Sequence, residues 1–102
     1  MKSKKITESA RGEDCTINIA GVCNYNPETV VFCHINFEGG AMGMKSSDVS
    51  GAYGCSDCHD AIDRRVYSSE LEDDRWFYLG RAMQRTTERL YEKGVIHIKG
   101  AK

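Results

Sequence analysis

Hydrophobic and polar residues follow different patterns in successive parts of the chain. Residues 1–14 are polar and show no period, so we expect a flexible N-terminal arm with no core to join. Residues 15–19 alternate, and Gly21 marks a turn before the next cysteine, which predicts a hairpin-like knuckle over 15–23. Residues 29–35 are β-branched and aromatic and predict a strand.

The remaining part of the chain is predicted to combine a long loop with helices. Residues 36–54 contain five glycines and little periodicity, which predicts a loop with a short strand around 51–53. Residues 55–66 predict one helix. Ser69 and Glu72 have the spacing of a capping box, and this spacing predicts the start of a second helix.

The second helix is predicted to be long and to run to Lys93. Gly94 supplies its C-terminal stop, and residues 95–98 have the composition of an edge strand. Its apolar positions recur at helical spacing and indicate a face that packs on the core or on a second copy of the chain, which would form a homodimer. These positions are Trp76, Leu79, Met83, Leu90 and Tyr91.

The composition agrees with one small folded domain. Of 102 residues, 40% are hydrophobic and 28% are charged, which excludes a disordered or fibrous chain. A domain of this size buries little apolar surface, so we expect a cross-link in addition to the core. The mixture of strands and helices predicts an α+β fold.

We expect neither a membrane span nor a signal segment in this sequence. No stretch approaches the roughly 20 apolar residues that cross a bilayer. The lysines near the N-terminus are followed by Thr7 and Glu8 rather than by an apolar core. We therefore expect a cytoplasmic protein without a membrane partner, whose five cysteines bind metal rather than form disulfides.

Charge limits how the chain can contact nucleic acid. A formal net charge of −1 excludes a dedicated nucleic-acid packaging protein, so any such contact must be local. Arg11, Arg64 and Arg65 lie near the cysteines and are candidates for bidentate contacts to phosphate. The alternative for each arginine is a solvated helix edge.

The cysteines have the spacing of a structural zinc site. Cys55 and Cys58 form a Cys-x2-Cys pair, and Cys15 and Cys23 form a wider pair with seven residues between them. Two pairs separated by a spacer of this length predict a tetrahedral thiolate site for zinc. Buried free cysteines and a redox pair are the alternatives. Cys33 is predicted to be a core residue outside the site.

Two histidines are candidates for catalysis. His59 and Asp63 lie four residues apart on a predicted helix and can share one divalent ion, although such pairs also occur on solvated helix faces. His34 follows a strand and precedes the glycine-rich loop. A neutral imidazole there can take a proton from water while the ion stabilises charge on the leaving oxygen of a phosphodiester.

These residues resemble a known nuclease pattern. His34-Ile35, the glycine-rich loop and residues 54–63 are similar to the HNH (ββα-metal) endonucleases, which carry a His-bearing strand, a loop and a Cys-x2-Cys-His helix. More closely, four segments resemble the YbcO nucleases of prophages and lambdoid phages. They are residues 10–15, 21–24, 26–29 and 58–65.

The resemblance implies a role for each residue. By this resemblance, the four paired cysteines bind structural zinc and His34 is the general base. His59 and Asp63 bind a catalytic ion such as Mg²⁺, Mn²⁺ or Ni²⁺. The chain departs from the HNH pattern at two places. Cys33 stands where the family carries a metal-binding Asp, and the middle Asn has no counterpart, although Ser50 falls at about its spacing and Asp48 is near.

The sequence therefore predicts a small α+β, zinc-bound ββα-metal domain with a long C-terminal helix. We expect an arm over 1–14, an HNH-like core over 15–66, and a helix with a short tail over 67–102. The expected function is metal-dependent hydrolysis of DNA in phage or prophage metabolism. Two alternatives stay open: a non-catalytic DNA-binding module of the same fold, and a zinc protein that binds partners through its long helix.

Overall fold

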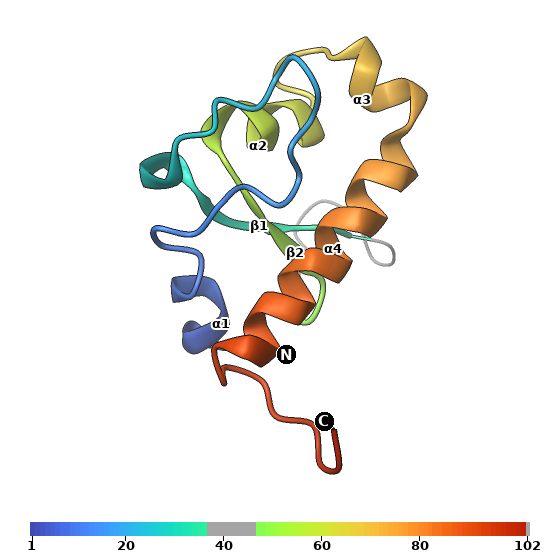
Figure 1. Ribbon diagram of the computed structural model, residues 1–102. Coiled ribbons are helices and arrows are strands. Elements are labelled where there is room, and N and C mark those ends of the chain that lie inside the picture. Colours follow the sequence, from blue (N-terminus) through green and yellow to red (C-terminus); the bar gives the residue numbers. More distant parts are fainter. Residues whose placement is uncertain (37–46, 102) are drawn as a thin grey trace.

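The computed structural model describes residues 1–36 and 47–101 of the chain. In this part the chain forms a small α+β fold with one two-stranded sheet and helices around it (Figure 1). In chain order the elements are α1 (Lys4–Glu8), the 3-10 helix η1 (Pro27–Thr29), β1 (Val31–His34), β2 (Gly51–Gly54), α2 (Ser56–Ile62), α3 (Ser69–Asp73) and α4 (Arg75–Glu92).

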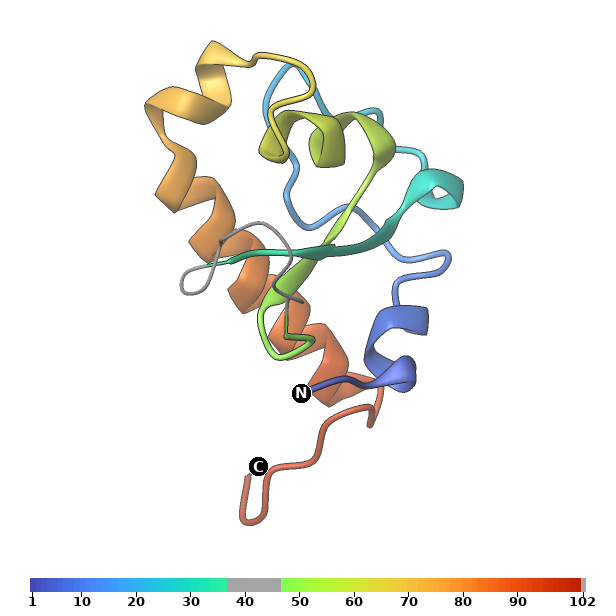
Figure 2. The ribbon, with the colours of Figure 1, turned by 180° about the vertical axis from the view of Figure 1, so that it is seen from behind.

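The two strands pair in antiparallel fashion, with Phe32 opposite Tyr53 and His34 opposite Gly51. Both strands and the start of α2 were predicted close to their observed bounds, whereas α2 ends at Ile62, before the expected end near Val66. α2 directly continues β2, and α4 packs along β2, as the front and back views show (Figures 1 and 2). The sheet therefore lies between the helix that carries His59 and the longest helix of the protein.

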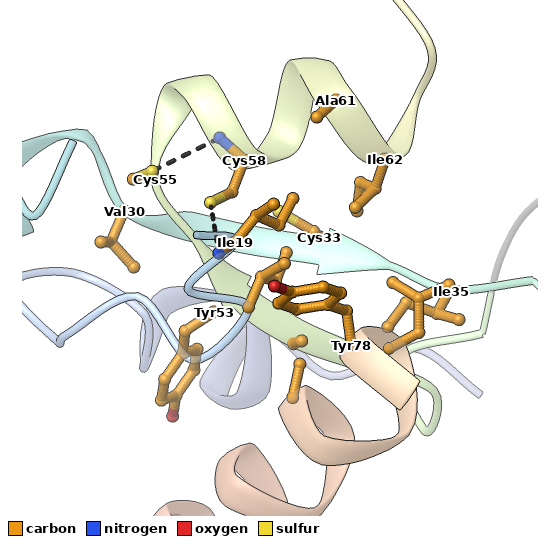
Figure 3. Close-up of a cluster of buried hydrophobic side chains, with 14 of the residues drawn as sticks. Ile19, Val30, Cys33, Ile35, Tyr53, Cys55, Cys58, Ala61, Ile62 and Tyr78 are labelled. Atoms are coloured by element: carbon orange, nitrogen blue, oxygen red, sulfur yellow. Dashed lines mark hydrogen bonds between the residues drawn. The ribbon is translucent and has the colours of Figure 1, made fainter. Parts of the chain in front are cut away.

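The core is centred on β2 (Figure 3). Tyr53 is fully buried, and its hydroxyl lies 2.8 Å from the hydroxyl of Ser9. Its backbone N–H donates to the hydroxyls of Thr16 and Thr86, which lie 2.7 Å from each other. These bonds satisfy buried polar groups, and they join the first cysteine segment, β2 and α4 in one network.

The N-terminal segment packs in the core, so the expectation of a flexible arm outside the core is wrong. Ser3 caps α1 by accepting a hydrogen bond from the Ile6 N–H. Ile6 and Ala10 are buried in the main hydrophobic cluster. Two apolar residues in a polar stretch show no helical period, but they are sufficient to bury one side of a single helical turn against β1.

The knuckle over 15–23 contains the predicted turn but no strand. Gly21 has a φ of +76°, and the N–H groups of Val22 and Cys23 both donate to the carbonyl of Ile19. The alternation over 15–19 arises because Ile17 and Ile19 are both fully buried. Thr16 contacts β2 at a single residue: its backbone N–H donates to the Tyr53 carbonyl, and no continuous strand pairing follows in this described segment.

The long helix differs from its prediction at its start, and so does the segment that follows its end. Ser68, not Ser69, caps α3 by accepting from the Leu71 N–H, and the chain leaves helical geometry at Asp74 before α4 begins. After α4, Gly94 has a φ of +74° and ends the helix as predicted. Val95 then donates back to the Leu90 carbonyl, so the expected edge strand over 95–98 does not form.

The apolar face of α4 packs largely as predicted. Leu79 and Leu90 are buried in the core and Met83 packs against it. Trp76 is 62% exposed and lies outside this face. Among the described residues, no helix has both the length and the apolar character needed to cross a bilayer.

Candidate metal centre and nuclease site

Four cysteine sulfurs meet at the junction of the knuckle and α2. The Sγ atoms of Cys15, Cys23, Cys55 and Cys58 all lie within 4.8 Å of one another, and those of Cys23 and Cys55 are 3.9 Å apart. Four thiolates bound to one zinc at about 2.3 Å would stand about 3.8 Å apart. The cluster can therefore hold a metal ion, and its donor set fits zinc.

Local backbone geometry aims N–H groups at these sulfurs. Cys55 is the N-cap of α2, and its Sγ accepts from the Cys58 N–H at 3.4 Å. The Cys58 Sγ accepts from the Ile19 N–H at 3.5 Å, and Figure 3 shows both bonds. Asn18, with a φ of +46°, donates its N–H to Cys15. Such bonds stabilise negative charge on sulfur.

The thiols affect one another's ionisation strongly. The hydrogen bond from the Cys58 thiol lowers the pKa of Cys15 to about 5, while the same bond raises the pKa of Cys58 far above its usual range. Burial raises the pKa of Cys23 to about 11. Neighbouring thiolates repel, so full ionisation of the cluster requires a cation at its centre.

Cys33 lies outside this cluster, as predicted. Its side chain is 1% exposed and packs in the core, and burial raises its pKa to about 12. Cys33 is therefore a small apolar residue in practice, and it offers no carboxylate to an ion at the position where the HNH pattern has one.

His34 stands at the end of β1 with its ring held from two sides. Its Nε2 lies 2.6 Å from Oδ1 of Asp48. This hydrogen bond is the largest cause of the lowered pKa of Asp48, and the hydrogen bond from the Ser3 N–H is the second. The Phe32 ring meets the imidazole edge-on, with centroids 5.3 Å apart. Ser50, the other candidate for the missing Asn, donates instead to the Ile35 carbonyl at 2.6 Å.

His59 on α2 and Asp63, the C-cap residue of this helix, contact each other as the spacing predicts. The distance from His59 Nε2 to Asp63 Oδ2 is 3.1 Å. Arg65 contacts the same carboxylate oxygen at 3.1 Å and Asp60 at 2.9 Å. The pair is therefore part of a surface network of charges, in which an ion would compete with the Arg65 guanidinium for Asp63.

A cleft of about 340 Å³ brings the two halves of the candidate site together. Its walls come from the end of β1, the end of α2 and the start of α4. The lining residues are His34, Ile35, Asn36, Ile62, Asp63, Arg64, Arg75, Trp76 and Leu79. His34 and Asp63 thus share one cavity, and His59 is joined to it through its contact with Asp63.

The candidate phosphate-binding arginines have different surroundings. Arg64 lines the cleft and pairs with Glu72 at 2.9 Å, which lowers the pKa of Glu72. Arg65 is committed to Asp60 and Asp63. Arg11 is exposed after α1 and does not belong to the described lining of the cleft.

Sequence reasoning did not identify Arg75 as part of the site. Arg75 is 18% exposed, donates to Glu72 at 3.0 Å and lines the cleft beside Trp76. Its spacing of three residues from Glu72 is a helical ion-pair signal, but the break at Asp74 separates the two residues into different helices.

Comparison with known proteins gives a consistent family. The family model described as "Putative nuclease YbcO" matches residues 4–95. "Putative nuclease YbcO" of Escherichia coli (strain K12) and "Putative nuclease ybcO" of Enterobacteria phage 82 are each 46% identical to this chain over 63 residues. These matches cover 61% of this chain and 66% of each relative, so the chain spans about two thirds of their length.

A solved structure extends the match over most of the fold. "Structure of a putative bacteriophage protein from Escherichia coli str. K-12 substr. MG1655" superposes with a TM-score of 0.67 at 37% identity. The match covers 86% of this chain and 98% of that chain. Because the family model spans nearly the whole described fold, including both cysteine pairs and the two candidate histidines His34 and His59, the chain belongs to the YbcO family, whose two members described above are each named "Putative nuclease".

Proposed function

We propose that the protein is an HNH-type, metal-dependent endonuclease that hydrolyses phosphodiester bonds in DNA. One observation carries the proposal: His34 and Asp63, which come from different elements, line the same cleft, and His59 contacts Asp63 at 3.1 Å. The order β1, β2, α2 with a cysteine site at the start of α2 agrees with a ββα-metal domain.

Each residue has a defined task in this proposal. His34 takes a proton from the attacking water. His59 and Asp63 hold a divalent ion, and their separation fits two ligands of one ion, which stand about 3 Å apart when each bond is about 2.1 Å. That ion supplies positive charge for the phosphate and for the leaving oxygen.

Zinc at the cysteine cluster holds the site together without taking part in the chemistry. Cys15 and Cys23 come from the knuckle, whereas Cys55 and Cys58 begin the helix that carries His59 and Asp63. Binding all four thiolates fixes the start of α2 against the rest of the fold. The orientation of the catalytic helix therefore depends on the structural ion.

The substrate and setting are part of the proposal. Arg64 and Arg75 give the cleft two guanidinium groups near Asp63, which suits a phosphate backbone. One relative comes from a bacteriophage, which supports a role in phage or prophage DNA metabolism inside the bacterial cytoplasm.

Plasmid nicking tests the proposal. The protein, loaded with zinc, is incubated with supercoiled DNA and Mg²⁺, Mn²⁺ or Ni²⁺. We expect nicking that EDTA stops and that His34→Ala and Asp63→Ala abolish. His97→Ala is the matched control, because His97 is exposed in the C-terminal tail away from the cleft. Nicking that persists in His34→Ala would refute the proposed general base.

A second candidate is a non-catalytic DNA-binding module. It is favoured by the closed network of His59, Asp63 and Arg65, which is already satisfied without an ion, and by Cys33 at the position of a metal-binding Asp. This candidate predicts zinc-dependent binding of DNA with no product under any of the three ions.

A homodimer through α4 is also proposed. Phe77 at the start of this helix is 61% exposed and does not line the cleft, and a second copy would cover it. Sedimentation of the protein and of Phe77→Ser tests it: a dimer that Phe77→Ser dissociates supports the proposal, and a wild-type monomer rejects it.

A further inference from the structure

We infer that Asp48 is a positioning residue that fixes His34 as the Nε2–H tautomer and so leaves Nδ1 as the atom that accepts the proton from water. This inference rests on the proposed function for its catalytic meaning, although the tautomer itself can be measured without activity.

The contact between the two side chains is close and sheltered. Oδ1 of Asp48 lies 2.6 Å from Nε2 of His34, and the Asp48 side chain is 4% exposed. An ionised carboxylate can only accept hydrogen bonds, so Nε2 must carry the hydrogen. A neutral imidazole has one ring hydrogen, and Nδ1 therefore keeps its lone pair.

The N-terminal residues hold the carboxylate in place. The Ser3 N–H donates to Oδ2 of Asp48 at 2.6 Å, and the Asp48 N–H donates to the Met1 carbonyl at 2.8 Å. The positive charge of Lys2 also favours the ionised form. Both carboxylate oxygens are thus engaged, which prevents the side chain from turning away from His34.

The turn before β2 places Asp48 opposite the end of β1. Ser50 accepts a backbone hydrogen bond from Ile35 and donates its hydroxyl to the Ile35 carbonyl, so the turn is fixed to the residue after His34. His34 itself pairs with Gly51 in the sheet register. Asp48 is therefore held by a turn that is hydrogen-bonded to the end of β1 and by the N-terminal segment.

The proton balance is simple. The proton leaves the attacking water and binds Nδ1 of His34, while the water oxygen bonds to phosphorus. The P–O bond to the leaving sugar oxygen breaks, and that oxygen keeps the electron pair, which the proposed divalent ion would stabilise until solvent water protonates the oxygen. The ring becomes a cation whose Nε2–H still faces the Asp48 carboxylate, and this charge pair stabilises the ring in the transition state.

Nitrogen NMR and kinetics test the inference together. Side-chain ¹⁵N spectra of the zinc-loaded protein, with the His34 signals assigned by their loss in His34→Ala, should show His34 only as the Nε2–H tautomer at neutral pH. Asp48→Ala should show a mixture of tautomers. We expect kcat for plasmid nicking to fall at least about 10-fold in Asp48→Asn and Asp48→Ala with KM little changed, because general-base catalysis as a whole contributes about 10²–10⁴-fold.

Asp73→Asn is the matched control, because Asp73 is exposed at the end of α3. Zinc content and circular dichroism test whether each variant is folded. If Asp48→Ala does not fold, the isosteric Asp48→Asn variant tests the inference in its place. A His34 ring protonated on Nδ1 in the wild type, or an Asp48→Asn protein with unchanged kcat, would overturn the inference. A wild type that cuts no DNA would refute the proposed function, while the tautomer would still decide the role of Asp48.

Discussion

Arg75 donates a hydrogen bond from its guanidinium to the backbone carbonyl of Ile62 over 2.6 Å. Ile62 is the last residue of α2 and Arg75 is the first of α4, so this bond ties the helix that carries His59 and is capped by Asp63 to the longest helix. Glu72 holds the same guanidinium at 3.0 Å. Since Arg75 and Ile62 both line the cleft, the bond fixes the distance between two of its walls.

We expect Arg75→Lys to weaken the contact between α2 and α4. Lysine keeps the charge but lacks the fork that reaches Glu72 and the Ile62 carbonyl together. The free energy of unfolding should fall by about 1–2 kcal/mol, and KM for DNA should rise. Urea unfolding and plasmid nicking measure the two effects. Arg85→Lys, at an exposed position on α4, should change neither, and an equal effect in both variants would contradict the assignment.

Metal removal should unfold the domain. The four thiolates join the knuckle to α2, and structural zinc contributes on the order of 10 kcal/mol to the folding of small domains. Chelation, or Cys55→Ser, should therefore abolish the cooperative thermal transition. Cys33→Ala is the control, since Cys33 lies outside the cluster, and it should retain one zinc per chain and unfold cooperatively. An apo protein with an unchanged melting temperature would contradict a structural ion.

The local parts of this structure were predictable. The cysteine cluster, the turn at Gly21 and the pairing of His59 with Asp63 depend on spacing over a few residues, and a sequence shows such spacing directly. The end of β2 and the start of α2 follow from the same signals, because Cys55 directly follows the strand and caps the helix.

The missed parts depend on contacts between distant segments. Ile6 is an isolated apolar residue whose burial against β1 is decided by tertiary packing. Asp48 reaches His34 only because the strands pair in one register, and Arg75 meets Ile62 only because the chain breaks at Asp74. None of these relationships has a local period or motif.

The close approach at Gly54 predicts contrasting effects for two glycine substitutions. A Cβ at Gly54 would lie 2.7 Å from the Cys33 Sγ and 2.7 Å from the Ile17 Cδ1, and both neighbours are buried. Gly54→Ala should therefore destabilise by about 1–3 kcal/mol. A Cβ at Gly80, inside α4, would meet nothing within 4 Å, so Gly80→Ala should stabilise the protein by about 0.5–1 kcal/mol. Chemical unfolding of the zinc-loaded proteins checks both signs, and a tolerated Gly54→Ala would show that the strand can shift.

Glu13 should make stability depend on pH at the acidic end. The hydrogen bond from Arg89 lowers its pKa below the ordinary value of 4.5, with Lys93 adding to the effect. A lowered pKa in the folded state gives stability that is present above about pH 4.5 and is lost as the pH falls through the folded value. Glu13→Gln should cost at most about 1 kcal/mol at pH 7, because Arg89 is half exposed, and progressively less as the pH falls through the lowered pKa of Glu13. Glu88→Gln, at an exposed site on α4, should show no such difference.

Trp76 offers a direct test of whether nucleic acid enters the cleft. It is the one tryptophan of the sequence, it is 62% exposed, and it lines the cleft with His34 and Asp63. A short single-stranded oligonucleotide added to the catalytically blocked His34→Ala protein should quench its fluorescence saturably, and added salt should reverse the quenching. Moving the reporter with Trp76→Phe and Tyr91→Trp places it near the other end of α4, where we expect no response. Equal quenching in both proteins would mean that the oligonucleotide does not bind selectively in the cleft, and binding without any change at Trp76 would place it on another surface.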